Sequence, residues 1–221
     1  MEKKKNDFIA QGSILAIASI LVRVMGMIYR IPMTAIIGDK GNGFYSYAYS
    51  VYTILLLLSS YSLPLAVSKM VSAKAQLGQW RNVKRVFICA IAFAIGIGTT
   101  FGLTVLIGAQ FFTRVFFHSE LAAIALRFMA PTILIMALLG VFRGFFQGLQ
   151  NTLPTAVSQI VEGLINAIMS VVFAYFLFDF GHGMDVASGT TDLGYAWGAA
   201  GGAIGTGAGA LAGLIFCFIL F

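Results

Sequence analysis

Long apolar segments alternate with short polar breaks along the whole chain. A transmembrane helix needs about 20 mostly apolar residues to cross about 30 Å of hydrocarbon. Six segments meet this requirement, at residues 8–37, 44–73, 86–112, 121–142, 153–178 and 194–221. The pattern predicts an all-α fold, a polytopic membrane bundle of six transmembrane helices that follows a short tail, residues 1–7. The first segment is too long and too polar inside for a cleaved signal peptide, so we expect it to be retained.

The composition excludes a water-soluble globular domain. Hydrophobic residues make up 59% of the 221 residues and charged residues only 10%, and the mean hydropathy is +0.92. The net charge is +6, but the sequence has no basic stripe with interleaved aromatic residues, so we expect no nucleic-acid partner. Both cysteines, Cys89 and Cys217, lie inside apolar segments, where a small buried thiol is the ordinary interpretation.

The positively charged residues predict the orientation of the bundle, because cytoplasmic loops carry an excess of Lys and Arg. With the amino terminus inside, nine basic residues fall on the cytoplasmic side and three fall outside. The cytoplasmic set is Lys3, Lys4, Lys5, Lys69, Lys74, Arg81, Lys84, Arg85 and Arg143, and the outer set is Lys40, Arg114 and Arg127. We therefore expect a multi-pass protein of the cell membrane with a cytoplasmic amino terminus.

The break between the second and third segments is basic and contains a tryptophan. Its sequence, KAQLGQWRNVKR at 74–85, places Trp80 among basic residues. This composition predicts a short amphipathic helix that lies on anionic membrane lipid. A helix that binds a partner protein is the alternative, since basic amphipathic segments serve both purposes.

The last segment carries small residues at a strict spacing and ends without a polar flank. Its glycines Gly201, Gly205, Gly209 and Gly213 recur every four residues, which lets the backbone of a neighbouring helix approach closely. The sequence stops at Phe221 within the apolar run. We therefore expect the chain to be the amino-terminal part of a longer protein.

Two arginines interrupt the first apolar segment, where a charge costs about 2.5 to 3.5 kcal/mol at the bilayer centre. Arg23 and Arg30 are two helical turns apart and share a face, with Gly26 between them. A guanidinium group stays charged and donates hydrogen bonds in a planar fork that suits phosphate or carboxylate. We predict that Arg23, Arg30 and Gly26 bind an anionic substrate. The alternative is that the arginines reach the interface or pair with an acidic residue on another helix.

One acidic residue, Glu162, lies near mid-depth in the fifth segment. It belongs to a polar stripe along one side of the helix, whose other members are Thr155, Ser158, Gln159, Asn166 and Ser170. The length of this stripe favours a water-filled cavity over a tight helix interface, and we predict that Glu162, Gln159 and Asn166 serve ion coupling or line that cavity. Three roles are open for Glu162: counter-ion of Arg23, protonatable coupling site, or hydrogen bonding at an interface.

The remaining polar residues indicate no catalytic or metal chemistry. Tyr45, Tyr49 and Tyr52 share a face at the outer start of the second segment, which is typical of an aromatic belt at the membrane interface, with sugar stacking as the alternative. His118 and His182 are isolated in the sequence. With no paired nucleophile and base and no clustered ligands, we expect no enzyme activity, no metal site and no cofactor.

Two stretches resemble a known family. They are VRVMGMIYRIPMTAIIGDKGNGFYSYAYSVYTILLLLSSYSLPLAVSKMVSA at 22–73 and GVFRGFFQGLQNTLPTAVSQIVEGLIN at 140–166. Both are similar to the stage V sporulation protein B and polysaccharide biosynthesis branch of the multidrug/oligosaccharidyl-lipid/polysaccharide exporter superfamily. Members have two six-helix lobes, so the resemblance implies that this chain is the amino-terminal lobe of a two-lobe transporter and that the carboxy-terminal lobe is missing. In the related lipid II flippases, first-helix arginines line a cationic cavity, so the matching RVxGxxxR pattern implies substrate contact for Arg23 and Arg30.

The resemblance implies a transporter rather than an enzyme. Its function would be to flip polyprenyl-pyrophosphate-linked oligosaccharides, precursors of peptidoglycan or surface polysaccharide, by alternating access. Its partners would be that lipid-linked substrate, membrane lipids and the missing lobe. The first segment has arginines where drug-exporting relatives have a coupling carboxylate, which favours an anionic substrate. The alternatives are a cation-coupled multidrug antiporter that uses Glu162 as coupling acid, and a non-transporting membrane scaffold for cell-wall or spore-coat assembly.

Overall fold

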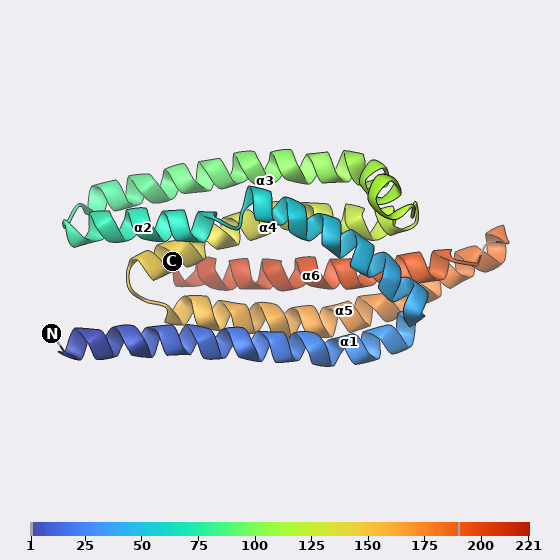
Figure 1. The fold of residues 1–221 in the computed structure, drawn as a ribbon, viewed down its shortest axis with the longest axis horizontal. Helices are drawn as coiled ribbons and strands as arrows, with labels where there is room; N and C mark the ends of the chain where they lie inside the picture. Colours follow the sequence, from blue (N-terminus) through green and yellow to red (C-terminus); the bar gives the residue numbers. More distant parts are fainter. Residues whose placement is uncertain (1, 190) are drawn as a thin grey trace.

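The structure, a computed structural model, describes residues 2–189 and 191–221, with side chains placed except in 2–11 and at 188. The described residues form helices joined by short turns and contain no β-strand, which confirms the all-α prediction (Figure 1). The helices are α1 (Glu2–Ser59), α2 (Leu63–Gln76), α3 (Trp80–Phe117), α4 (Ala122–Gly148), α5 (Leu153–Ser188) and α6 (Leu193–Leu220).

Helix α1 turns back on itself at Gly38 (Figure 1). This residue has φ 63° and ψ −177°, a backbone conformation that is essentially restricted to glycine. The helix resumes directly after it, so the first two predicted segments are two arms of α1 rather than helices joined by a loop. By length and composition, five helical stretches of the described residues suit a membrane crossing, and the first, Gly12–Gln76, contains both arms.

The second predicted segment is broken near its middle. The second arm of α1 ends at Ser59, residues 60–62 form a turn, and α2 begins with Pro64 in its first turn. Proline lacks a backbone N–H and clashes with the turn before it, so a helix readily starts at this residue but does not run through it.

Helices α4 and α6 run through the middle of the bundle, with α2 and α3 on one side and α5 and the first arm of α1 on the other (Figure 1). The start of α1, the α2–α3 turn, the α4–α5 loop and the end of α6 lie at one end of the bundle (Figure 1). The Gly38 reversal and the connections α3–α4 and α5–α6 lie at the other. This arrangement places the basic α2–α3 turn at the same end as the beginning of the chain.

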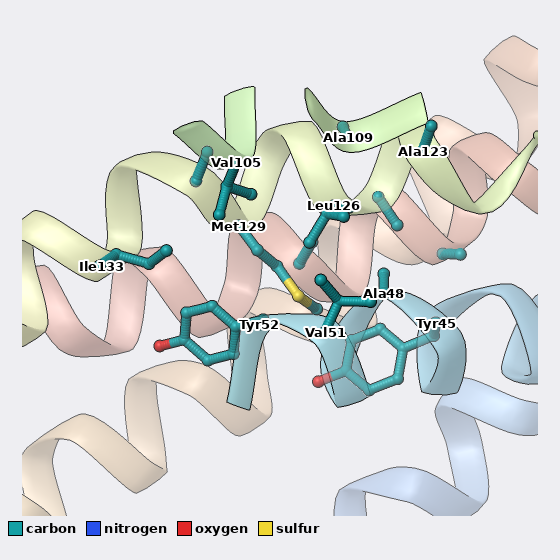
Figure 2. Packing of buried hydrophobic residues seen from close by; sticks show 14 of the residues in the cluster. Tyr45, Ala48, Val51, Tyr52, Val105, Ala109, Ala123, Leu126, Met129 and Ile133 are labelled. Carbon is teal, nitrogen blue, oxygen red and sulfur yellow. The ribbon is translucent and has the colours of Figure 1, made fainter. Parts of the chain in front are cut away.

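The core lies around α4 and is apolar. Leu126, Met129 and Ile133 of α4 are fully buried, and they pack with Val51 of α1 and Val105 of α3 (Figure 2). Large apolar side chains also cover the outside of the bundle, and Ile107 of α3 is 81% exposed. An apolar surface of this extent is stable in hydrocarbon rather than in water, which agrees with a multi-pass membrane protein.

The glycine stripe of α6 packs against α5, as its spacing predicts. A Cβ atom added at Gly205 would overlap Ser170, and one at Gly209 would lie 2.6 Å from the carbonyl oxygen of Glu162. The two helices therefore approach at backbone-to-backbone distance, which only small residues permit.

The basic segment 74–85 does not form a helix of its own. Lys74 lies in the last turn of α2, and α3 begins at Trp80 after a three-residue turn. Gly78 has φ 68° in that turn, and this left-handed conformation lets the chain reverse between two antiparallel helices. Trp80 is 62% exposed at the start of α3, so its side chain still suits an interfacial anchor.

Candidate functional site

A cavity of about 410 Å³ lies between the two arms of α1 and helices α4, α5 and α6. Its lining residues are Val22, Gly26, Met27, Tyr29, Arg30, Tyr45, Tyr49, Tyr52, Leu56, Met136, Glu162, Asn166 and Thr206. Met27 is 64% exposed and Arg30 is also exposed, so the cavity opens to the outside of this chain along the first arm of α1. The fold therefore brings together residues from four helices around one polar, partly open space.

Tyrosines form one wall of the cavity. Tyr45, Tyr49 and Tyr52 follow one face of the second arm of α1, with successive ring centroids 5.8 and 5.9 Å apart. Tyr45 is 2% and Tyr52 3% exposed, and the hydroxyl groups of Tyr45 and Thr206 are 3.3 Å apart. Figure 2 shows both buried rings with their hydroxyls directed to the same side. The prediction of an aromatic belt is wrong for Tyr45 and Tyr52, because the Gly38 reversal folds this face inward against α4 and α6.

The two arginines of α1 occupy different places. Arg30 lines the cavity and is exposed, whereas Arg23 is exposed on the same arm outside the lining. Neither forms an ion pair with an acidic side chain in the described part of the chain. Gly26 lines the cavity between them, and a Cβ atom there would meet nothing within 4 Å, so its face is open.

Glu162 lines the cavity, but its charge is already neutralised. Its carboxylate accepts a hydrogen bond from Nη2 of Arg143 at 2.7 Å, and the side chains of Arg143 and Glu162 are 12% and 24% exposed. Arg143 Nε also donates to the hydroxyl of Ser158 at 2.9 Å. The counter-ion of Glu162 is therefore Arg143 of α4 and not Arg23, which corrects one of the three roles left open by the sequence.

Most of the polar stripe of α5 faces neighbouring helices rather than the cavity. Thr155, Ser158 and Ser170 are fully buried, and Ser170 donates to the side-chain oxygen of Asn166 at 2.8 Å. Gln159 accepts a hydrogen bond from Ser19 of α1 at 3.3 Å. Among the stripe residues, only Glu162 and Asn166 reach the cavity. The other stripe residues thus lie at helix interfaces, because α6 packs closely against α5 and the first arm of α1 lies beside it.

The sequence reasoning missed Arg143, Tyr29 and Thr206. Arg143 stands one residue beyond the predicted end of the fourth segment and was assigned to a cytoplasmic loop, whereas α4 continues to Gly148. The apolar pair Phe145 and Phe146 after Arg143 was the available signal that the segment continues. Tyr29 and Thr206 reach the cavity only through the packing of α1 on α6, which no local pattern reveals.

The site holds no arrangement typical of a metal centre. Over the described residues, no group of three or more His, Cys, Asp or Glu side chains converges on one point. What the cavity does offer is a cationic group, a row of phenol rings and several hydrogen-bonding side chains. Such a lining suits a ligand that combines negative charge with hydroxyl-rich or ring-shaped parts.

The comparisons with known proteins agree with this chemistry. A family model described as polysaccharide biosynthesis protein matches residues 8–220. The chain is 26% identical over 218 residues to stage V sporulation protein B of Bacillus subtilis strain 168, an alignment that covers 98% of this chain and 39% of the relative. It is 26% identical over 200 residues to lipid II flippase MurJ of the same organism, covering 86% of this chain and 37% of that protein. The chain thus spans less than half the length of these relatives, and no solved structure matches it significantly.

Proposed function

The chain belongs to the polysaccharide biosynthesis protein family, and from this premise we propose that the full-length protein flips polyprenyl-pyrophosphate-linked oligosaccharides across the cytoplasmic membrane. Precursors of peptidoglycan or surface polysaccharide are the substrates in this proposal. The similarity to a lipid II flippase supports the reaction, and the cavity supports the substrate class. The protein acts as a transporter, so its work is binding and conformational change rather than bond cleavage.

The observation that carries the proposal is the pairing of Arg30 with a tyrosine wall in one cavity. The guanidinium group of Arg30 suits the pyrophosphate, because it donates hydrogen bonds in a planar fork and keeps its charge at every physiological pH. The exposed ring of Tyr49 and the neighbouring hydroxyl groups suit a saccharide. Gly26 and Asn166, which line the cavity, and Arg23, two helical turns from Arg30 on the same arm, remain predicted contributors.

The proposal includes the topology of the membrane domain. We place six crossings, in which the two arms of α1 cross separately and α2 completes the second crossing. The amino end is cytoplasmic: even with Arg143 removed from the cytoplasmic set, eight basic residues stand against three. The carboxy-terminal lobe of the full-length protein covers the cavity on the side where Met27 and Arg30 are exposed.

A cation-coupled drug antiporter has less support. That mechanism needs an acidic residue that is free to exchange protons or cations, and Glu162 is held by Arg143 at 2.7 Å. An exposed arginine in the cavity also repels cationic drugs. A membrane scaffold without transport activity is the other alternative. It would move no lipid across the membrane, so a transport assay distinguishes it from the proposed flippase.

A leaflet-accessibility assay tests the proposal. The full-length protein is placed in vesicles with a fluorescent polyprenyl-pyrophosphate saccharide, and wild type is compared with the Arg23→Gln, Arg30→Gln double variant. The control is Arg114→Gln, which removes one arginine charge from an exposed position on α3. We expect wild type and the control to flip the lipid and the double variant to lose this activity. Wild-type protein that moves no lipid-linked saccharide would contradict the proposed function, and equal flipping by all three proteins would contradict the role of the arginines.

A further inference from the structure

A second cavity lies on the outside of the bundle, between α2 and α3. It has a volume of about 480 Å³, within the range of about 300 to 1,000 Å³ that is usual for ligand sites. Its lining residues are Leu63, Ala66, Val67, Met70, Arg85, Val86, Cys89, Ala90 and Phe93. All of these except Arg85 are uncharged, and almost all are apolar. The cavity is therefore an apolar groove with one cationic group.

The cationic group stands at one end of the groove. Arg85, Cys89 and Phe93 follow one face of α3 at four-residue spacing, so the groove extends about 12 Å from Arg85 towards the middle of the bundle. Arg85 lies in the second turn of α3, at the bundle end that also carries Lys74, Arg81 and Lys84. No acidic residue occurs in the sequence between Asp39 and Glu120. No acidic side chain within this stretch of the sequence can therefore neutralise the charge of Arg85 at the mouth of the groove.

The groove is separate from the tyrosine-lined cavity. Within the described residues, α2 and α3 pack against each other and against α4, and α3 also contacts α1. At the cytoplasmic end of the proposed topology, the ring of Phe87 on α3 stacks on that of Phe221, directly after α6, at 4.5 Å. No residue lines both cavities. A ligand in the groove therefore lies against the outer surface of the bundle, where membrane lipids meet the protein, and not on the transport route.

We propose that this groove binds one anionic phospholipid, with an acyl chain between α2 and α3 and its phosphate on Arg85. An apolar channel that ends at a single guanidinium group has the same order of parts as a phospholipid, with a hydrocarbon chain below an anionic head group. Arg85 donates to the phosphate in a bidentate way, and the exposed ring of Trp80 lies at the level of the head groups. This site is independent of the substrate proposed for the tyrosine-lined cavity.

Cys89 reports on the groove, because it is exposed and lines it, whereas Cys217 is fully buried. The experiment uses purified full-length protein in neutral detergent, with increasing phosphatidylglycerol or phosphatidylcholine. N-ethylmaleimide is added, and the modification of Cys89 is followed by mass spectrometry of its peptide. Each variant's rate without added lipid is its own reference, and an unmodified Cys217 shows that the protein remains folded.

We expect phosphatidylglycerol to slow the modification of Cys89 and phosphatidylcholine to have little effect. Arg85→Gln should raise the half-protecting concentration of phosphatidylglycerol about fivefold, the effect of one basic residue near an anionic lipid. Lys84→Gln is the matched control, because it removes the same charge one position away, outside the lining of the groove, and should change that concentration much less.

Three results would overturn the proposal. Equal protection of Cys89 by both phospholipids would show that the anionic head group does not contribute to binding. Equal losses of protection by phosphatidylglycerol in Arg85→Gln and Lys84→Gln would show that the basic surface attracts the lipid in general, without a specific contact to Arg85. Protection by a polyprenyl phosphate at lower concentration than by phosphatidylglycerol would assign the groove to the tail of a different lipid. Because no step involves transport, failure here leaves the flippase assay unaffected.

Discussion

At the residue scale, one group of polar side chains links α4 to α5 inside the bundle. Arg143 is its centre, since its guanidinium group binds the Glu162 carboxylate and the Ser158 hydroxyl, while its backbone carbonyl accepts a hydrogen bond from Thr155 at 3.4 Å. In an apolar surrounding, removal of one member leaves the other as an uncompensated charge, which costs more than removal of both. The pair therefore fixes α4 against α5 beside the cavity.

We expect Glu162→Gln to lower the melting temperature of the full-length protein, because Arg143 then loses its counter-ion. The loss in free energy of unfolding is on the order of 2.5 to 3.5 kcal/mol, the insertion cost of a charged residue at the membrane centre. Thermal unfolding followed by tryptophan fluorescence measures it. The double variant Arg143→Met, Glu162→Gln should recover part of the loss, since neither charge remains. A single variant as stable as wild type would show that the pair contributes nothing.

At the element scale, Gly38 and the glycine stripe of α6 determine how the helices are arranged. Gly38 reverses α1 so that its second arm lies across α4, and this reversal places the tyrosine face inside the bundle. The α6 stripe allows α5 and α6 to touch through their backbones. An exposed ion pair between Lys40 and Asp192, at 2.9 Å, joins the reversal to the start of α6, and such pairs contribute at most about 1 kcal/mol. Backbone geometry rather than charge thus holds this end together.

The Gly38→Ala variant should be less stable by about 1 to 3 kcal/mol, because alanine does not readily adopt φ 63° with ψ −177°. Gly43→Ala is the control: this glycine lies five residues further along α1, has an ordinary helical backbone, and has open space where a Cβ would stand. Melting curves of the two full-length variants make the comparison. Equal stability of the two proteins would mean that the reversal does not depend on glycine.

The Gly205→Ala variant tests the α5–α6 contact. The added methyl group overlaps Ser170, so the helices must separate, and overpacking of this kind costs about 1 to 3 kcal/mol. Gly96→Ala on α3 adds the same methyl group where nothing lies within 4 Å, and should be neutral or slightly stabilising, since alanine favours a helix over glycine. The melting temperatures of the two full-length variants are compared with that of wild type. Similar shifts in both would argue against a close helix contact at Gly205.

The local sequence pattern predicted the helices better than it predicted the residues of the tyrosine-lined cavity. The apolar segments predicted the helices because hydrophobicity over about 20 residues depends on sequence alone, and the glycine spacing predicted a tight helix contact for the same reason. The reversal without a loop was not predictable, since it rests on the backbone angles of one residue, Gly38. The partner of Glu162 and the inward face of Tyr45 were missed because both depend on which helices become neighbours.

At the scale of the whole molecule, this chain forms one side of a cavity whose open edge is the first arm of α1. Arg23, Met27, Arg30 and Ile31 are exposed along that arm, and two of the four residues are charged. A charged and open helix face is unfavourable against hydrocarbon, and this observation supports both the proposed covering lobe and the proposed anionic ligand. The proposed function therefore requires that the substrate's charged head group lies in this cavity beside Arg30.

Site-specific photo-cross-linking tests this claim most directly. A benzoylphenylalanine is introduced into the full-length protein at Met27, which lines the cavity, or at Ile31, which is 73% exposed one turn away but does not line it. Each protein is irradiated with a radiolabelled polyprenyl-pyrophosphate saccharide. We predict strong labelling from position 27, weak labelling from position 31, and loss of the signal at 27 when Arg30→Gln is added. Equal labelling from both positions, or labelling at 27 that persists without Arg30, would contradict the account.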